Sequence, residues 1–240
     1  NDTATTEIYT LSLHDALPIS SMASCAFRSV MNAFDVLGRI DPTDTVVIQG
    51  AGPLGLLATA VAKISGARRV VTLGAPAPRL ALARDFGADE VISIEETSHA
   101  ERLDQVRALT DGRGADVVME FTGHPAAFGE GLDLARRGAA YVVVGQLGQG
   151  TTTIAPSAIV AKNLRVLGSF SGQAKAYWKA LDFVAKHRHE VTAGNQIRQV
   201  SVSVGLLGNG RNEPDILTVR PIGRRPFAAT LTRPHSRDIL

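Results

Sequence analysis

The stretch Val46–Ala58, VVIQGAGPLGLLA, contains three glycines, Gly50, Gly52 and Gly55, in the spacing G-x-G-x-x-G. The spacing alone is weak evidence for a binding site, because most short glycine patterns of this kind are ordinary turns. Here a β-branched run that is typical of a strand precedes the glycines, and apolar residues at helical spacing follow them. Glycines between a strand and a helix are the context in which this motif binds the pyrophosphate of a dinucleotide. The stretch therefore predicts both a βαβ unit and a dinucleotide site.

Each position of the motif has a physical reason. Gly50 allows a tight turn, Gly52 has no side chain to keep a pyrophosphate away, and Gly55 lets the helix pack close to the strand. The start of the helix then offers unpaired N–H groups and the positive end of its dipole to the phosphates. We expect cofactor contacts from Gly50, Gly52, Pro53, Leu54 and Gly55.

One part of the dinucleotide fingerprint is absent. An acidic residue at the end of the second strand usually binds the ribose 2′-hydroxyl of NAD. The corresponding strand here ends in VVTLGAPAPR, with Gly74 at that place and Arg79 nearby. A small residue and an arginine leave room and charge for a 2′-phosphate, although Arg79 also fits a solvated helix residue. We therefore predict an NAD(P) site with NADP favoured, and Gly74 and Arg79 on its ribose side.

Strand and helix patterns alternate through the middle of the chain. Alternation with short connections predicts a parallel sheet that is covered on both faces. The fold class is thus α/β, a Rossmann-type doubly wound parallel sheet of about six strands. We expect the strands at 45–49, 69–73, 90–94, 116–121, 139–145 and 164–170, and a closing helix at 174–186.

The composition is that of an ordinary globular protein of 240 residues, with 45% hydrophobic and 20% charged residues. The formal net charge of +2 gives no reason to expect a nucleic acid or a membrane as partner. No apolar run reaches the roughly 18 residues of a membrane-spanning helix. The single cysteine, Cys25, cannot form an internal disulfide, which suits a reducing compartment, so we expect a cytoplasmic protein.

The two ends of the chain differ from its middle. Residues 1–19, NDTATTEIYTLSLHDALPI, match the translation of a common short-read sequencing adapter, so we expect residues 1–20 to carry no selected chemistry. Residues 190–240 contain scattered prolines and arginines without a sustained strand or helix period. A Pro-rich, partly ordered tail and a frameshifted one both fit this composition. The predicted domains are an adapter-derived segment at 1–20, a dinucleotide-binding domain at 21–189 and an irregular tail at 190–240.

Several motifs together resemble one known family. GAGPLG, LARDFGADEVI, DGRGADVVMEFTG and YVVVGQLG are similar to the nucleotide-binding domain of zinc-type medium-chain dehydrogenases/reductases, the alcohol dehydrogenase superfamily. The resemblance runs from about residue 21 to about residue 189. In that family, three segments that match residues 122–123, 144–145 and 168–169 of this chain line the nicotinamide side of the cleft. The resemblance therefore implies cofactor contacts at Thr122, Gly123, Val144, Gly145, Gly168 and Ser169.

The same resemblance implies a role for Cys25. It lies 25 residues before Gly50, the spacing at which zinc-type members place a cysteine that ligates the catalytic zinc. A thiolate suits Zn²⁺, which favours sulfur and nitrogen ligands, whereas a buried, inert cysteine would fit as well. The family's other zinc ligands belong to a GroES-like catalytic domain, which has no counterpart before Ser21. We therefore expect a truncated chain with Cys25 as a metal ligand and no assignable catalytic residue.

The family's activity is hydride transfer between NAD(P) and an alcohol or carbonyl, so a small molecule of that class is the implied substrate. Two alternatives remain open: a zinc-free quinone or enone reductase of the same superfamily, against which Cys25 argues, and a non-catalytic dinucleotide-binding remnant. Without the catalytic domain, we expect cofactor binding but no turnover by this chain alone. The resemblance also allows a homo-oligomer that pairs at sheet edges. For His124, beside Gly123, we expect a capping or loop role.

Overall fold

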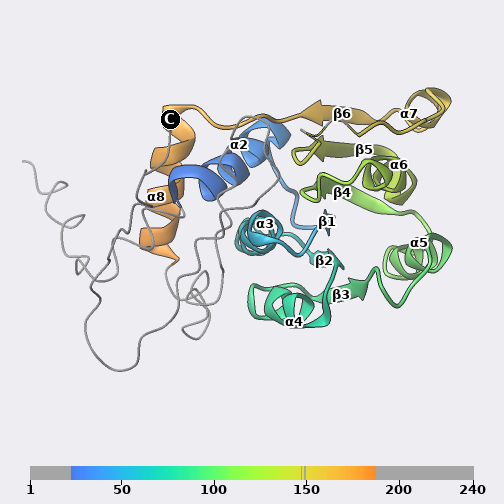
Figure 1. The fold of residues 1–240 in the computed structure, drawn as a ribbon, viewed down its shortest axis with the longest axis horizontal. Coiled ribbons are helices and arrows are strands. Elements are labelled where there is room, and N and C mark those ends of the chain that lie inside the picture. Colours follow the sequence, from blue (N-terminus) through green and yellow to red (C-terminus); the bar gives the residue numbers. More distant parts are fainter. Residues whose placement is uncertain (1–22, 147, 149, 188–240) are drawn as a thin grey trace, which may run out of the picture. The chain divides into compact units, whose positions relative to one another are not determined.

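The computed structural model describes residues 23–146, 148 and 150–187. Its centre is a parallel six-stranded sheet with the order β3-β2-β1-β4-β5-β6 (Figure 1). This order reverses between β1 and β4, as in a Rossmann fold, which confirms the predicted fold class. The predicted segments 1–20 and 190–240 lie outside the described residues. The strands are β1 (Thr45–Gln49), β2 (Arg69–Gly74), β3 (Glu90–Ser93), β4 (Ala115–Glu120), β5 (Ala135–Val143) and β6 (Arg165–Gly168).

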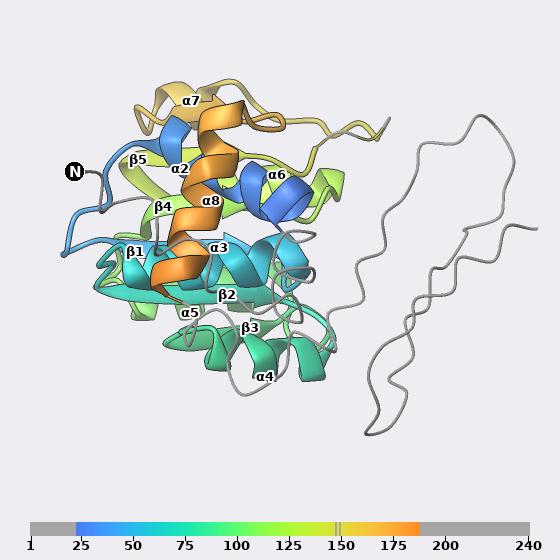
Figure 2. The same ribbon diagram turned by 90° about the vertical axis from the view of Figure 1, so that its left-hand side faces the viewer.

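Helices cover both faces of the sheet (Figures 1 and 2). A π-helical turn, η2 (Ala23–Phe27), leads into the first helix, and a short helix, α7 (Ser157–Val160), precedes β6. The sequence pattern does not predict α7, because four residues are too few to show a helical period. One face carries α2 (Arg28–Leu37), α3 (Pro53–Ile64), α4 (Ala77–Asp85) and α8 (Ala174–Lys186); α5 (His99–Ala108) and α6 (Pro125–Leu134) lie on the other, with α7 (Ser157–Val160) beside α6.

Alternate residues of the strands supply two separate cores. In β1, Val46 and Ile48 pack with the α3 side, whereas Val47 packs with the α6 side. In β4, Met119 belongs to the first core and Val118 to the second. All five are completely buried, and each such side chain stabilises the fold by about 1.5–3 kcal/mol. Packing on both faces therefore holds the strand ends in fixed positions.

The boundaries of two strands differ most from the predicted ones. β5 begins at Ala135 rather than at residue 139, and Arg136 in this added part donates a hydrogen bond to the buried Asp116 of β4. Because the ion pair stabilises polar residues at the start of β5, a strand prediction based on apolar residues misses this part. β6 is shorter than predicted and covers Arg165–Gly168 rather than residues 164–170.

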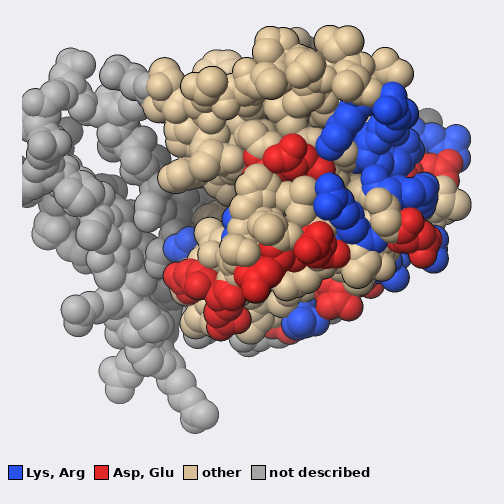
Figure 3. Space-filling model, turned by 90° about the vertical axis from the view of Figure 1, so that its right-hand side faces the viewer, with Lys and Arg blue, Asp and Glu red and all other residues tan. Residues whose placement is uncertain are grey.

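The face that carries α5, α6 and α7 has charges of both signs (Figure 3). In this view most Lys and Arg residues lie at the right, Asp and Glu are frequent at the lower left, and the upper left is largely uncharged. Among the residues that the structure describes, none of the helices has the length and apolar character needed to cross a bilayer.

Candidate cofactor-binding site

Most of the predicted cofactor contacts lie at one edge of the sheet, where parallel strands end. The register places Gln49 of β1 opposite both Leu73 and Glu120, and Val143 of β5 opposite both Glu120 and Gly168. The turns after these strands therefore start at the same level. In open α/β sheets, ligands bind at this carboxyl edge where the strand order reverses, which here is between β1 and β4.

The turn after β1 has the shape that its glycines were predicted to allow. Gly50 has a φ of +116°, which side chains rarely permit. A Cβ atom on Gly55 would lie 1.8 Å from the carbonyl oxygen of Gly50, so only glycine lets α3 come this close to β1. A Cβ on Gly52 would instead meet nothing within 4 Å. The turn is closed at Gly55 and open at Gly52, where the sequence predicts the approach of a pyrophosphate.

The helix α3 begins directly after this turn, with Gly52 as N-cap and Pro53 at its first position. Proline suits that position because it has no N–H group to leave unpaired. No side chain caps the helix within the described part of the chain. The N–H groups of Leu54 and Gly55 belong to the first turn, whose donors have no partner inside a helix. They are available, together with the positive end of the dipole, for an anion.

The end of β2 has no space for the acidic residue of the NAD fingerprint. A Cβ on the buried Gly74 would lie 2.6 Å from the Cβ of Ala51, so any side chain there would displace the glycine turn. Arg79 lies in the first turn of α4 and is exposed. In the described ranges it takes part in no ion pair. The guanidinium of Arg79 is therefore free to bind an anion.

A buried carboxylate organises the turns after β4 and β5. Glu120, the last residue of β4, is completely buried. Its Oε1 accepts hydrogen bonds from the N–H of Thr122 at 2.6 Å, from Thr122 Oγ1 at 2.7 Å and from the N–H of Gly123 at 2.7 Å. Its Oε2 accepts a hydrogen bond from the N–H of Gly145 at 3.0 Å. One side chain thus holds two of the three turns in which nicotinamide contacts were predicted.

These two turns also approach each other and the glycine turn. A Cβ on Gly123 would lie 2.8 Å from the carbonyl oxygen of Gly145, and a Cβ on Gly50 would lie 3.3 Å from Cγ2 of Thr122. Val144 is buried beside Gly145. The structure therefore brings the predicted contacts of three turns together at the centre of the carboxyl edge.

The two predicted contacts after β6 differ in exposure. Gly168 is exposed, whereas Ser169 is buried and its Oγ accepts a hydrogen bond from Asn32 Nδ2 of α2 at 3.0 Å. Arg28 of α2 donates to Ser171 Oγ at 3.3 Å. These two bonds hold α2 against the β6 turn. They also engage the Ser169 hydroxyl within the protein, so the side chain predicted as a cofactor contact already has a partner.

Cys25 lies in η2, about one helical turn before α2, and it is exposed. The alternative prediction of a buried cysteine is therefore wrong. Within residues 23–146, 148 and 150–187, no three side chains of His, Cys, Asp or Glu are placed to hold a metal ion. Because a catalytic zinc needs three protein ligands, the described residues alone do not fit a zinc ion. The ligand role of Cys25 stays a prediction.

Two histidines have structural contacts. His124 Nδ1 accepts the N–H of Ala126 at 3.3 Å and caps α6, which confirms the predicted capping role. His99 is exposed at the start of α5, and its Nε2 lies 3.4 Å from a carboxylate oxygen of Asp133. These contacts account for both side chains without a catalytic role.

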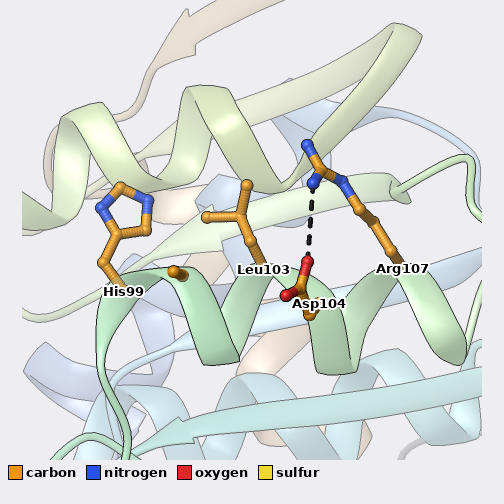
Figure 4. A pocket seen from close by; sticks show the side chains of 5 residues that line it. His99, Leu103, Asp104 and Arg107 are labelled. Atoms are coloured by element: carbon orange, nitrogen blue, oxygen red, sulfur yellow. Dashed lines mark ion pairs between the residues drawn. The ribbon is translucent and has the colours of Figure 1, made fainter.

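An open hollow runs along α5 and is lined by His99, Ala100, Leu103, Asp104 and Arg107 (Figure 4). All of these residues come from one helix, and the ion pair drawn there, between Asp104 and Arg107 at 3.6 Å, is internal to that helix. Ligand sites usually combine a few convergent polar groups in a concave, largely apolar pocket. The hollow contains none of the predicted contacts, and we assign it no function.

Glu120 and Gln49, two polar residues at the ends of apolar strand runs, are site residues that were not predicted from the sequence. Both are buried. Gln49 Nε2 donates to the carbonyl of Ala127 at 3.0 Å, and the Tyr141 hydroxyl lies 3.3 Å from Gln49 Oε1, to which it donates. Burial raises the pKa of Tyr141, which keeps its hydroxyl a donor. The sequence feature that could have identified Glu120 and Gln49 is a single polar residue in a β-branched run, because a buried polar side chain needs hydrogen-bond partners.

Comparisons with known proteins agree with this geometry. Residues 53–186 match the family model of zinc-binding dehydrogenases. The chain is 36% identical over 176 residues to 5-exo-hydroxycamphor dehydrogenase of Pseudomonas putida. This match covers 73% of the chain and 49% of that protein. It is 33% identical over 179 residues to sorbitol dehydrogenase of Bacillus subtilis, and this match covers 73% of the chain and 50% of that protein.

A solved alcohol dehydrogenase from Thermotoga maritima is similar to the chain in structure, with a TM-score of 0.72 and 34% identity. The match covers 76% of this chain and 50% of that one. The chain therefore spans about half the length of the relatives it matches.

Proposed function

The chain belongs to the zinc-binding dehydrogenase family, and we propose that it binds NAD(P) at the carboxyl edge of its sheet. We further propose that the reaction it serves is hydride transfer between this cofactor and a small alcohol or carbonyl compound. The relatives named for 5-exo-hydroxycamphor and sorbitol, which are both alcohols, support that substrate class.

The observation that carries the proposal is the contrast between Gly52 and Gly55. The helix packs so close at Gly55 that a Cβ would collide with the carbonyl of Gly50, yet the space over Gly52 is open. A pyrophosphate needs both features, because it must come near the backbone and receive N–H groups from the first turn of the helix. In this proposal Leu54 and Gly55 donate their N–H groups, and Pro53 starts the helix.

The nicotinamide half of the cofactor would lie against the turns after β4 and β5. Thr122, Gly123, Val144 and Gly145 meet there, next to the glycine turn. Bound NAD(P) supplies the hydride chemistry, and the residues of this chain bind and orient it. Gly168 and the backbone of Ser169 extend the same edge. The described residues do not complete a ligand set for zinc, so the role proposed for them is to bind and orient the cofactor.

We propose a preference for NADP over NAD on two observations. Gly74 has no room for the carboxylate that would bind a ribose 2′-hydroxyl. Arg79 is exposed in the first turn of α4, the helix that follows this strand. A guanidinium without a carboxylate partner attracts a 2′-phosphate, which a carboxylate would repel.

Gly52→Ala tests the binding site without disturbing the fold. Its Cβ would meet nothing within 4 Å, and the φ of −78° is ordinary for any residue. We expect unchanged thermal unfolding and a Kd for NADH that rises about tenfold or more, because the added methyl group occupies the place of the pyrophosphate. The measurement is calorimetric titration of the full chain.

Gly129→Ala is the matched control, because a Cβ on this glycine of α6 also meets nothing within 4 Å and Gly129 is not a predicted contact. Its Kd should equal that of the wild type. A wild-type chain that binds neither NADH nor NADPH would overturn the proposal, and so would undiminished binding by Gly52→Ala. A Kd for NADPH that is equal to or higher than that for NADH would overturn the preference alone.

A further inference from the structure

Glu120 is a buried acidic residue that forms no ion pair with any Lys, Arg or His that the structure describes. It is completely buried at the end of β4. Burying a carboxylate is costly unless hydrogen bonds replace its hydration. Four donors do so here, and all of them belong to the turns after β4 and β5.

These donors join two turns that are distant in the sequence. Thr122 and Gly123 follow Glu120 directly, whereas Gly145 lies 25 residues away along the chain. Gly123 has a φ of +71°, and a Cβ on it would lie 2.8 Å from the carbonyl oxygen of Gly145. Glycine makes this close approach sterically possible, and the carboxylate holds it, because its two oxygens accept from opposite turns.

We propose that Glu120 is a positioning residue for the nicotinamide half of the cofactor. Because it is completely buried, it acts through the backbone of Thr122, Gly123 and Gly145. The turns after β1 and β2, which would bind the pyrophosphate and the adenosine ribose, supply none of its donors. Its loss should therefore affect one half of the cofactor and spare the other. This inference rests on the proposed function.

Glu120→Gln tests the inference with a side chain of the same size. One acceptor oxygen becomes an NH₂ group, and in either orientation this group faces the N–H of Gly123 or of Gly145. We expect the Kd for NADH to rise about tenfold, while the Kd for ADP-ribose, which lacks nicotinamide, changes less than about twofold. Both values come from calorimetric titration of the full chain.

Glu130→Gln is the matched control. Glu130 of α6 is also largely buried, but its carboxylate is paired with Arg102 at 2.5 Å. Its replacement should destabilise the fold and leave the ratio of the NADH and ADP-ribose Kd values unchanged. A merely structural role of Glu120 would give the same unchanged ratio.

The outcomes separate this inference from the proposed function. If the wild type binds both ligands and Glu120→Gln leaves the ratio of their Kd values unchanged, only the positioning role of Glu120 is overturned. If the wild type binds neither ligand, the proposed function fails and the inference fails with it. Should Glu120→Gln not fold, Thr122→Val removes one of the four donors and keeps the carboxylate. Thr122→Ser keeps this donor, so only the valine variant should shift the ratio; equal ratios in the two variants would overturn the positioning role.

Discussion

Two parts of the candidate site are built in opposite ways. The turn after β1 takes its shape from side chains that are absent, because Gly50 has a φ of +116° and Gly55 lies closer to the backbone of Gly50 than a Cβ would permit. The turns after β4 and β5 take their shape from a side chain that is present, the buried carboxylate of Glu120. Steric exclusion fixes the first region, and hydrogen bonds fix the second.

This difference predicts different responses to substitution. An added atom at Gly55 has no place to go, so it must move α3 away from β1. A lost hydrogen bond to Glu120 leaves three others in place and should weaken the second region by degrees. Substitutions in the first region should therefore lower the stability of the fold, and substitutions in the second should weaken cofactor binding.

Gly55→Ala should have the largest effect on stability. Its Cβ would lie 1.8 Å from the carbonyl oxygen of Gly50, which is backbone and cannot turn away. We expect the free energy of unfolding to fall by about 3 kcal/mol or more, since overpacking against the backbone displaces a whole helix. Urea unfolding followed by circular dichroism measures this change.

The Gly129→Ala control should be neutral or slightly stabilising in the same experiment, because alanine favours a helix more than glycine does. A Gly55→Ala variant with the unfolding midpoint of the wild type would show that α3 can shift at little cost. That result would contradict the steric account of the first region.

Thr122→Val should have a smaller effect, which falls on the second region. The substitution removes a hydroxyl that donates to Glu120 Oε1 at 2.7 Å and accepts from the N–H of His124 at 3.0 Å. We expect a loss of about 1–2 kcal/mol in the free energy of NADH binding. Thr122→Ser keeps the hydroxyl and should bind NADH almost as the wild type does. Equal weakening by both variants would assign the effect to the methyl group instead of the hydrogen bonds.

The same contrast explains what could be predicted from the sequence. The three glycines of the first region lie within six residues, so Gly50, Gly52 and Gly55 predict the turn, the helix start and the fold class locally. The role of Glu120 depends on Gly145, which is 25 residues away, and on the pairing of β4 with β5. The periodicity of neighbouring residues in the sequence does not show which strands pair, so the role of Glu120 could not be predicted from it.

Two other predictions depend on residues distant in the sequence. The early start of β5 was missed because Arg136 enters the strand through its bond to Asp116, 20 residues away. For Cys25, the resemblance to zinc-type dehydrogenases implies a ligand role, and the structure shows an exposed thiol. A ligand set is defined by side chains that meet in space, and within the described ranges no such set forms.

The start of α5 offers an exposed counterpart of the Glu120 arrangement. Glu101 Oε2 accepts hydrogen bonds from the N–H of Ser98 at 2.7 Å and from Ser98 Oγ at 2.8 Å. These bonds, the backbone one first, lower the pKa of Glu101. A carboxyl group whose pKa is lowered on folding stabilises the fold above its unfolded pKa. This stabilisation is lost as the pH falls through the folded pKa.

We therefore expect Glu101→Gln to lower the urea midpoint slightly at neutral pH, and the difference from the wild type to shrink as the pH falls below the ordinary carboxyl pKa of 4.5. In a Ser98→Ala background the same substitution should change the midpoint less, because the hydroxyl partner is already lost. The effect should be the smallest of the three, since water hydrates an exposed carboxylate once its hydrogen bonds break. A fall in the urea midpoint as large as that of Glu120→Gln would contradict the idea that burial makes the carboxylate of Glu120 effective.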